Sequence, residues 1–158
     1  MAKVTCEIEI RASVEEVWQV MQDPTRRGEW DFRITGGRFT KDGHPTKGAT
    51  FTVGGRMVLP YRFDMEYLAV TPYRQTVVRL VRAHGLPIAE GAGSWTYLVE
   101  GPERSLVRSA FRFTLKQPWH FLFDKWLLTP LMVLVTKRSL RRLRKLVERE
   151  RKFRQGSI

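Results

Sequence analysis

The 158-residue sequence is poor in the residues on which disulfides, metal sites and histidine catalysis depend, with one cysteine and three histidines. Cys6 has no second cysteine to pair with, which excludes an internal disulfide and suits a reducing compartment. The histidines, His44, His84 and His120, lie far apart in the chain, so no metal site is predicted. The N-terminus alternates instead of running apolar, and the best apolar run, 126–135, is too short to span a membrane and contains Pro130. We therefore expect a soluble cytoplasmic protein.

Recognisable catalytic motifs are also missing from the sequence. HExxH, CxxC, GxSxG and the P-loop pattern do not occur, and the segment GAGSWT lacks the third glycine of GxGxxG. We expect no cofactor. Two polar residues are the catalytic candidates. Arg79 would bind an anionic or carbonyl end of a ligand if it pointed inward instead of to water. His84 would serve as a general base near a pocket mouth if it were more than a polar cap at a strand end.

Acidic residues are scarce at one end of the chain, where most of the net charge of +12 is concentrated. Residues 137–154 contain ten basic and two acidic side chains, a net charge of +8, which leaves +4 for the other residues. Such a surface attracts anionic lipid or nucleic acid, or it serves only to keep the protein soluble. Nucleic-acid readers interleave aromatic with basic residues, and Phe153 is the only aromatic here, so no nucleic acid is expected.

The last quarter of the sequence predicts a long amphipathic helix from about residue 130 to 152, preceded by a short helix after Pro118. One arc of the long helix is mostly apolar and carries Met132, Val135, Ser139, Leu140, Leu143, Leu146 and Val147. The other arc is a basic face with Lys137, Arg138, Arg141, Arg142, Arg144, Lys145, Arg149, Arg151 and Lys152. Residues 131–135 are apolar all round, so something must cover them on more than one side, either as a pocket lid or as a dimer contact. Trp119, Phe123 and Trp126 in the short helix are a gate, a membrane anchor or packing residues.

The preceding residues read as one strand, two short helices and about six further strands. Residues 4–10 alternate, Ser13 and Glu16 form a capping box, and the segment TRRGEWDF turns Trp30 and Phe32 toward something apolar. Strands followed by a helix predict an α+β fold in which the helix covers one face of an antiparallel sheet. The strand faces are rich in large apolar side chains that fill a core or line a cavity: Phe51, Phe63, Met65, Tyr67, Trp95, Tyr97, Phe111 and Phe113.

Three segments carry a resemblance to a known superfamily: EIEIRASVEEVWQVMQDPTRRGEW, GSWTYLVEGPERSLVRSAFRF and PLMVLVTKRSLRRLRKLVE. Their order and apolar spacing resemble the START-like or Bet v 1-like (SRPBCC) helix-grip superfamily, in particular its polyketide cyclase/dehydrase and lipid-transport branch. The length of the chain predicts a single domain over residues 1–158 with a short basic tail from about 153, and the resemblance covers residues 4 to about 150. The resemblance implies a curved antiparallel sheet of about seven strands wrapped on the terminal helix, with two short helices after the first strand and a hydrophobic cavity inside.

Three functions follow from these observations. The first is binding or transport of a lipid, isoprenoid or polyketide-like molecule, and the second is a polyketide cyclase or dehydratase acting in the same cavity. A polar cluster with shifted pKa values deep among the aromatic residues would favour the enzyme. The third is a peripheral membrane protein whose basic face contacts anionic lipid. A homodimer is also compatible with the sequence. The predicted ligand-binding residues are Phe51, Phe63, Met65, Tyr67, Trp95, Tyr97, Phe111, Phe113, Trp126, Met132 and Val135.

Overall fold

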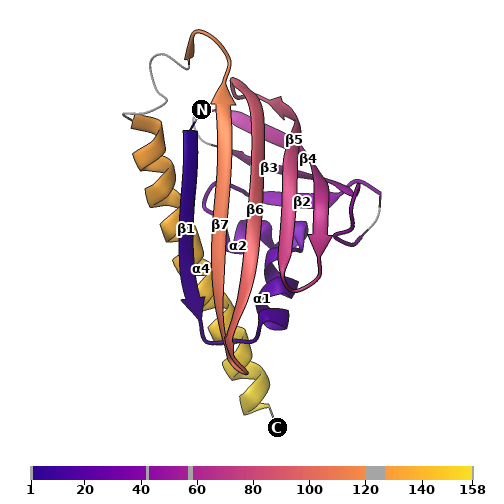
Figure 1. Cartoon of the computed structure of the whole chain (residues 1–158), viewed down its shortest axis with the longest axis vertical. Helices are drawn as coiled ribbons and strands as arrows, with labels where there is room; N and C mark the ends of the chain where they lie inside the picture. The colour runs from indigo at the N-terminus through magenta and orange to yellow at the C-terminus, as the bar shows by residue number, and fades with distance from the viewer. Residues whose placement is uncertain (1, 42, 57–58, 120–126, 158) are drawn as a thin grey trace.

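A computed structural model describes residues 2–41, 43–56, 59–119 and 127–157 of the chain. Within them, seven antiparallel strands form one sheet in the order β1-β7-β6-β5-β4-β3-β2, which confirms the expected sheet (Figure 1). Consecutive strands from β2 to β7 are neighbours, and β1 closes the order by pairing with β7. The strand bounds are β1 Ala2–Ile10, β2 Gly36–Phe39, β3 Thr50–Arg56, β4 Pro60–Thr71, β5 Gln75–His84, β6 Ile88–Gly101 and β7 Arg104–Leu115.

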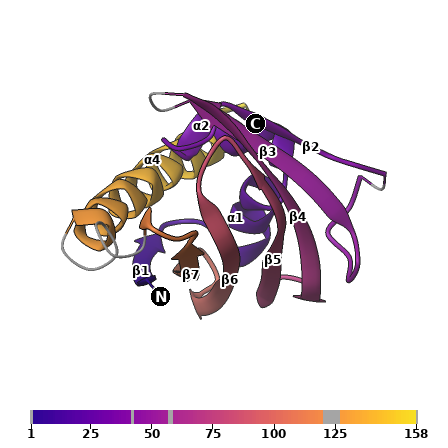
Figure 2. The same ribbon diagram turned by 90° about the horizontal axis from the view of Figure 1, so that it is seen from above.

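The helices lie on one side of the curved sheet, which we call its inner face (Figure 2). After β1 come α1 (Val14–Met21), the 3-10 turn η1 (Pro24–Arg26) and α2 (Arg27–Trp30), and the chain ends in α4 (Thr129–Gly156). The predicted capping box of α1 is present, because Ser13 and Glu16 each accept a hydrogen bond from the other's backbone N–H. Together these elements confirm the helix-grip α+β fold.

The ends of α4 differ slightly from the prediction. Its N-cap is Leu128 and its first residue is Thr129, one residue before the predicted start. The helix also continues to Gly156, past the point where a basic tail was expected. The short helix predicted after Pro118 falls mostly on residues 120–126, outside the described residues.

The apolar arc of α4 is buried over its C-terminal half and only partly buried over its N-terminal half. Ser139, Leu140, Leu143, Leu146 and Val147 are buried as predicted, whereas Met132 and Val135 are half-buried. The described residues of the chain do not cover residues 131–135 on more than one side, so the expected cover, a pocket lid or a dimer contact, stays a prediction. Within that stretch, Leu131 keeps 43% of its surface exposed and Leu134 keeps 62%.

The apolar interior consists of three clusters instead of one continuous core. The α4 core contains the buried residues of α4 with β1, α1 and Trp30. The β3–β4 cluster contains Ile34, Ala49, Phe51, Val53, Tyr61, Tyr67 and Val78, and the β7 cluster contains Ala2, Phe113 and Leu115. Half-buried side chains connect them. Trp95 contacts the first two clusters, and Phe111 and Met132 contact the first and third. We call this meeting place, marked by Trp95, Phe111 and Met132, the junction.

Candidate ligand site and its buried arginine pair

The predicted ligand-binding residues divide into two groups by burial. Four are fully buried in the clusters and act as core: Phe51, Tyr67, Tyr97 and Phe113. Six are half-buried, so part of each side chain stays free to contact another molecule: Phe63, Met65, Trp95, Phe111, Met132 and Val135. Trp126 lies outside the described residues. The junction residues belong to the second group, which makes the junction the best candidate for a ligand site.

The structure does not bring Arg79 to the inner face. Its neighbour Val78 points into the β3–β4 cluster, and Arg79 points to the opposite, outer face of the sheet. There its guanidinium forms an ion pair with Glu66, with 2.6 Å between Arg79 Nη2 and Glu66 Oε2. The inward position considered for Arg79 is therefore wrong.

His84 lies on the outer face as well. Its Nε2 is 2.9 Å from Asp64 Oδ2, and the hydroxyl of Thr52 donates to the other carboxylate oxygen of Asp64 at 3.0 Å. Partial burial raises the pKa of Asp64, but the hydrogen bonds from His84 and Thr52 outweigh it and leave that pKa lowered. This arrangement matches the polar cap weighed for His84, and it lies on the side of the sheet away from the junction.

A buried carboxylate with two arginines occupies the inner face instead. Asp31 is buried and accepts a hydrogen bond from Arg27 Nε at 3.1 Å. From the other side, Arg33 donates through Nε at 2.9 Å and Nη2 at 3.0 Å, one to each carboxylate oxygen. The backbone N–H of Arg33 adds a fourth hydrogen bond at 3.1 Å. We call Arg27 and Arg33 the arginine pair; their side chains are 12% and 23% exposed.

The arginine pair lies at the junction. The guanidinium carbon of Arg27 is 4.5 Å from the ring centroid of Trp30 and 4.6 Å from that of Trp95. The guanidinium carbon of Arg33 is 5.1 Å from the ring centroid of Phe111. Arginines stacked on aromatic faces in this way are held in a fixed orientation and gain cation–π attraction. Trp95 and Phe111, two of the three side chains that mark the junction, are therefore each stacked against a guanidinium group.

Burial and ion pairing shift the pKa values of this cluster. Burial acts to raise the pKa of Asp31, but the charges and hydrogen bonds of Arg33 and Arg27 outweigh it, so that pKa lies well below its ordinary range. Burial lowers the pKa of Arg27, which Asp31 only partly offsets. For Arg33 burial also acts to lower the pKa, but pairing with Asp31 prevails and raises it. Because guanidinium groups stay charged in proteins and the lowered pKa favours the carboxylate form of Asp31, the cluster has two positive charges and one negative.

Local structure explains how these residues meet. Arg27 in α2 and Asp31 at its C-cap are four residues apart, which places them on one face of a helical turn. The backbone of Arg33 is held from β4, because the Tyr61 hydroxyl donates to the Arg33 carbonyl. Gly55 allows this approach, since a Cβ there would overlap the carbonyl oxygen of Arg33. Gly54 and Gly55 stand in regular register with Arg62 and Tyr61 of β4.

A second polar group lies close to the arginine pair and is satisfied internally. The Tyr67 hydroxyl donates to Gln22 Oε1 at 2.9 Å, and Gln22 Nε2 donates to the Tyr97 hydroxyl at 2.5 Å and to the Thr76 hydroxyl at 3.2 Å. All four side chains are buried. Burial raises the pKa of both tyrosines well above the ordinary value, so they stay protonated at neutral pH. This network therefore satisfies the polar groups of these four side chains inside the core.

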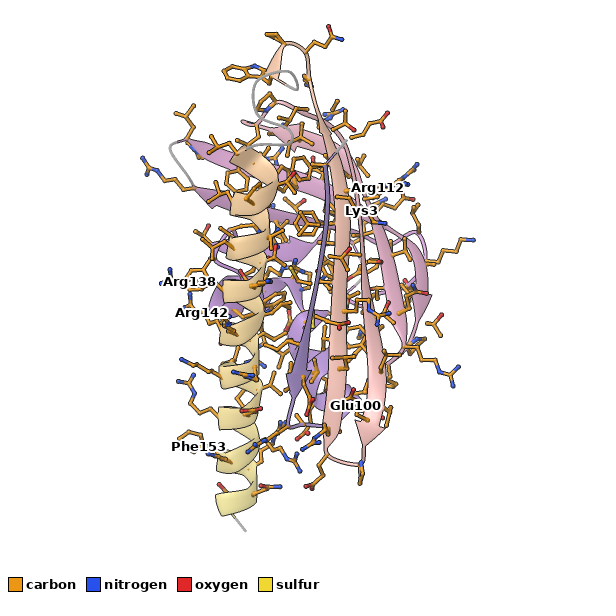
Figure 3. The ribbon with its side chains drawn as sticks, turned by 60° about the vertical axis from the view of Figure 1, so that its left-hand side comes forward. Lys3, Glu100, Arg112, Arg138, Arg142 and Phe153 are labelled. Carbon is orange, nitrogen blue, oxygen red and sulfur yellow. The ribbon has the colours of Figure 1, made fainter. Side chains whose placement is uncertain are left out.

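Sequence reasoning missed Arg27, Asp31 and Arg33. It interpreted TRRGEWDF as a short helix that buries its aromatics, which is correct for Trp30 but not for Phe32, which lies exposed. Arg138 and Arg142 project from α4 (Figure 3). The guanidinium carbon of each lies 5.0 Å from the ring centroid of Phe32. The available signal was the Arg-x-x-x-Asp-x-Arg spacing, because a carboxylate four residues after one arginine and two before another can pair with both.

Other features of the described residues give no competing site. Two surface hollows of about 460 and 800 Å³ lie beside the C-terminal end of α4 and the β6–β7 turn, and no aromatic residue lines either. Over the described ranges, no group of three His, Cys, Asp or Glu side chains is placed to hold a metal ion. No helix in the same residues is both long and apolar enough to cross a membrane.

Several solved structures resemble this fold. The protein TTHA0849 from Thermus thermophilus matches with a TM-score of 0.77 and 18% identity, over 94% of this chain and 98% of that one. A START superfamily protein from Mycobacterium smegmatis matches with a TM-score of 0.70 and 16% identity, over 97% and 99%. The di-domain ARO/CYC BexL of the BE-7585A biosynthetic pathway matches with a TM-score of 0.72 and 14% identity, over 94% of this chain and 47% of that one. At such identities the likeness shows the fold alone.

Sequence comparison identifies the family. No curated protein matches the chain. A family model described as polyketide cyclase / dehydrase and lipid transport matches residues 1–148, which include the whole sheet, the short helices and most of α4. This agrees with the resemblance carried by the three sequence segments and with the helix-grip architecture. The chain belongs to the polyketide cyclase / dehydrase and lipid transport family.

Proposed function

We propose that this protein binds a hydrophobic small molecule, such as a lipid, an isoprenoid or a polyketide-like compound, at the junction between the sheet and α4. One observation carries the proposal. The interior is divided into three buried clusters, and Trp95, Phe111 and Met132, which connect them, are only half-buried. A core with smaller satellite clusters is common in a domain, and the feature that matters here is that the side chains between the clusters are incompletely covered. Incompletely covered aromatic and thioether side chains of this kind are typical of the lining of small-molecule sites.

Small residues on β6 support the same location. Gly93 stands in register between Val78 of β5 and Phe111 of β7, both of which point to the inner face. A Cβ at Gly93 would lie 3.5 Å from the Phe111 Cβ and 3.6 Å from a Val78 methyl, which is ordinary contact. An alanine would therefore fit there without strain. The absence of a side chain leaves room on the inner face next to Phe111.

The electrostatics favour a carrier or sensor over a cyclase or dehydratase. A polar cluster with shifted pKa values does lie among the aromatic residues, as an enzyme would require. The shifts, however, move Asp31 down and Tyr67 and Tyr97 up, away from the neutral range in which a general acid or base works best. Asp31, Tyr67 and Tyr97 are also engaged in hydrogen bonds to other side chains. We therefore propose binding without turnover.

Native mass spectrometry of freshly purified protein, followed by organic extraction, tests this proposal. We expect an apolar compound bound in a one-to-one ratio, which the extract then identifies by class. An apo mass that stays unchanged when lipids, isoprenoids and polyketide-like compounds are added would contradict it. Conversion of any added compound to a product would instead favour the enzyme.

A second candidate function, contact with an anionic membrane surface, is favoured by the outer side of α4. Leu131 and Leu134 of α4 are 43% and 62% exposed, and Leu127, just before the helix, is 60% exposed. The exposed residues Arg138 and Arg141 continue the same side of the helix. Exposed leucines beside cationic side chains suit the interface of a bilayer with acidic lipids. A carrier of hydrophobic molecules would use such a contact to exchange its ligand.

Pelleting with vesicles of phosphatidylcholine alone or with added phosphatidylserine tests this contact. We expect binding only to the acidic vesicles, weaker at high salt, and lost in the double variant Leu131→Ser, Leu134→Ser. Val99→Ser is the matched control, because Val99 is an exposed apolar residue near the opposite end of the sheet. Failure to pellet at any salt concentration would refute the membrane contact. A wild-type dimer that becomes monomeric in the double variant would show that a second copy covers these leucines.

A further inference from the structure

We propose that the ligand carries a carboxylate and that the arginine pair binds this group. The inference rests on the proposed function and adds the chemical class of the ligand's polar end: a long-chain monocarboxylic acid in its anionic form. The carboxylate would meet Arg27 and Arg33 at the junction, and its apolar chain would lie along Trp95, Phe111 and Met132.

The hydrogen bonds within the cluster leave donors to spare. Asp31 accepts four N–H hydrogen bonds, one from Arg27 and three from Arg33. These use Nε of Arg27, and Nε, Nη2 and the backbone nitrogen of Arg33. No described residue accepts a hydrogen bond from Arg27 Nη1, Arg27 Nη2 or Arg33 Nη1. None of these three nitrogens is among the fully enclosed, unpaired atoms of the described residues either. They are therefore open to an acceptor that the chain itself does not supply.

The charge balance points to an acceptor with a single negative charge. Two guanidinium groups face one carboxylate, so the cluster has a net charge of +1 on the inner face. Burial raises the pKa of the nearby Cys6 thiol, and the positive charges of Lys137 and Arg33 oppose that shift, so no further negative charge comes from β1. A poorly solvated positive charge is unfavourable unless it is paired. One ligand carboxylate would make the cluster neutral and accept two N–H donors, the geometry that guanidinium prefers.

The position of the pair suits an amphipathic ligand. Arg27 stacks on Trp95 and Arg33 on Phe111, so each guanidinium adjoins an aromatic side chain that is half-buried at the junction. Stacking leaves the edge of the guanidinium plane, where the N–H groups lie, free to donate. An ion-pair site with an apolar surface next to it matches a molecule with a charged head and a hydrocarbon chain.

The test compares cis-parinaric acid with its methyl ester, two fluorescent probes that have the same chain and differ in the charge of one end. We expect wild-type protein to bind the acid about tenfold to a hundredfold more tightly than the ester at pH 7.5, the range for hydrogen bonds to a charged group. Equal affinity for acid and ester would overturn the carboxylate site and leave the hydrophobic site standing. Binding of neither probe would count against both.

Variants then assign the preference to residues. Arg33→Gln and Arg27→Gln should each reduce the preference for the acid at least severalfold, while the affinity for the ester stays near that of wild type. Arg112→Gln is the matched control. Arg112 follows Phe111 in β7, is exposed and points away from α4, so its loss removes the same charge from the outer face (Figure 3). If both arginine-pair variants kept the full preference for the acid, the proposal would be wrong. Should either variant fail to fold, Arg33→Lys replaces it, because lysine keeps the charge but loses the two-point pairing. The comparison of acid and ester binding to wild-type protein does not depend on any variant.

Discussion

The two halves of α4 show that burial in this protein does not follow local hydrophobicity. Residues 131–135 are all apolar, yet Leu131 and Leu134 are exposed and the others are half-buried. The later part of the helix is mostly basic, yet Leu140, Leu143, Leu146 and Val147 are buried, whereas Phe153 near its end is exposed. The C-terminal half packs against β1, α1 and Trp30, whereas the N-terminal half faces the junction. The incompletely buried apolar surface of residues 131–135 therefore lies where a ligand or a membrane would contact it.

Polar contacts reinforce the same difference. The C-terminal half of α4 is tied to the remaining chain by ion pairs of Arg26 with Glu150, Arg151 with Glu103, and Arg154 with Glu16. Glu148 also accepts a hydrogen bond from the backbone of Arg11 at 3.0 Å. Among the described residues, no ion pair involves positions 129–147 of the helix. The stretch 129–138 is thus held mainly by half-buried apolar side chains and by the stacking of Arg138 on Phe32, without an ion pair to another described residue, which leaves it better suited to adjust around a bound molecule.

The largest loss of stability is expected at the cluster that borders both regions. Asp31→Ala removes the carboxylate that pairs with Arg27 and Arg33 and leaves two poorly solvated positive charges. We expect the free energy of unfolding to fall by about 3–5 kcal/mol, measured by urea denaturation. Asp64→Ala is the control, because its partners His84 and Arg62 lie near solvent; it should cost no more than about 1 kcal/mol. Equal effects would contradict the structural role assigned to Asp31.

A pair of leucine truncations compares the two halves of α4 directly. Leu143→Ala empties a fully buried position in the α4 core and should lower the free energy of unfolding by about 2–5 kcal/mol. Leu134→Ala removes an exposed side chain and should change it by less than about 0.5 kcal/mol. Thermal or urea unfolding of both variants measures the difference. A large loss at Leu134 would mean that another surface, such as a second copy, covers it in solution.

Acidification should weaken the ion pairs of Asp31 gradually, as its carboxylate becomes protonated. The pKa of Asp31 lies below its unfolded value of 3.8, so the unfolded state binds the proton first as the pH falls. The contribution of Asp31 to the free energy of unfolding is complete when the pH is a unit or more above 3.8. It is lost progressively as the pH falls from there toward the lowered pKa. Urea unfolding between pH 7 and 3 should show this decline in wild type. Asp31→Asn should show a shallower decline, and a slope identical to wild type would exclude Asp31 as its source.

An effect on ligand binding, instead of on stability, is expected at Gly93. Gly93→Leu would extend a side chain past Phe111 into the junction and should weaken binding of cis-parinaric acid at least about tenfold, or about 1.4 kcal/mol. Gly101→Leu on the same strand is the control, because Gly101 lies at the β6–β7 turn. Unchanged affinity in Gly93→Leu would move the ligand site away from the junction.

Much of the fold could be predicted from the sequence because it depends on local patterns. The alternation in β1, the capping box of Ser13 and Glu16, and the helical spacing of Leu140, Leu143 and Val147 each identify an element and its buried side. Strand alternation also indicates Phe63 and Trp95 as inner-face residues. The same alternation would have turned Arg79 outward, since Val78 and Leu80 flank it in β5.

What the sequence determined by itself was the set of elements, their buried faces and the concentration of positive charge on one helix, because each depends on neighbours within a few turns or a single strand. Tertiary structure alone decided that the core splits into three clusters, that the most apolar turn of α4 stays exposed, and that Arg27 and Arg33 stack on Trp95 and Phe111. The segment that carries the arginine pair has no repeating period, and its partners come from β6 and β7, far along the chain. Such contacts depend on how the sheet curves around the helices, which no local pattern encodes.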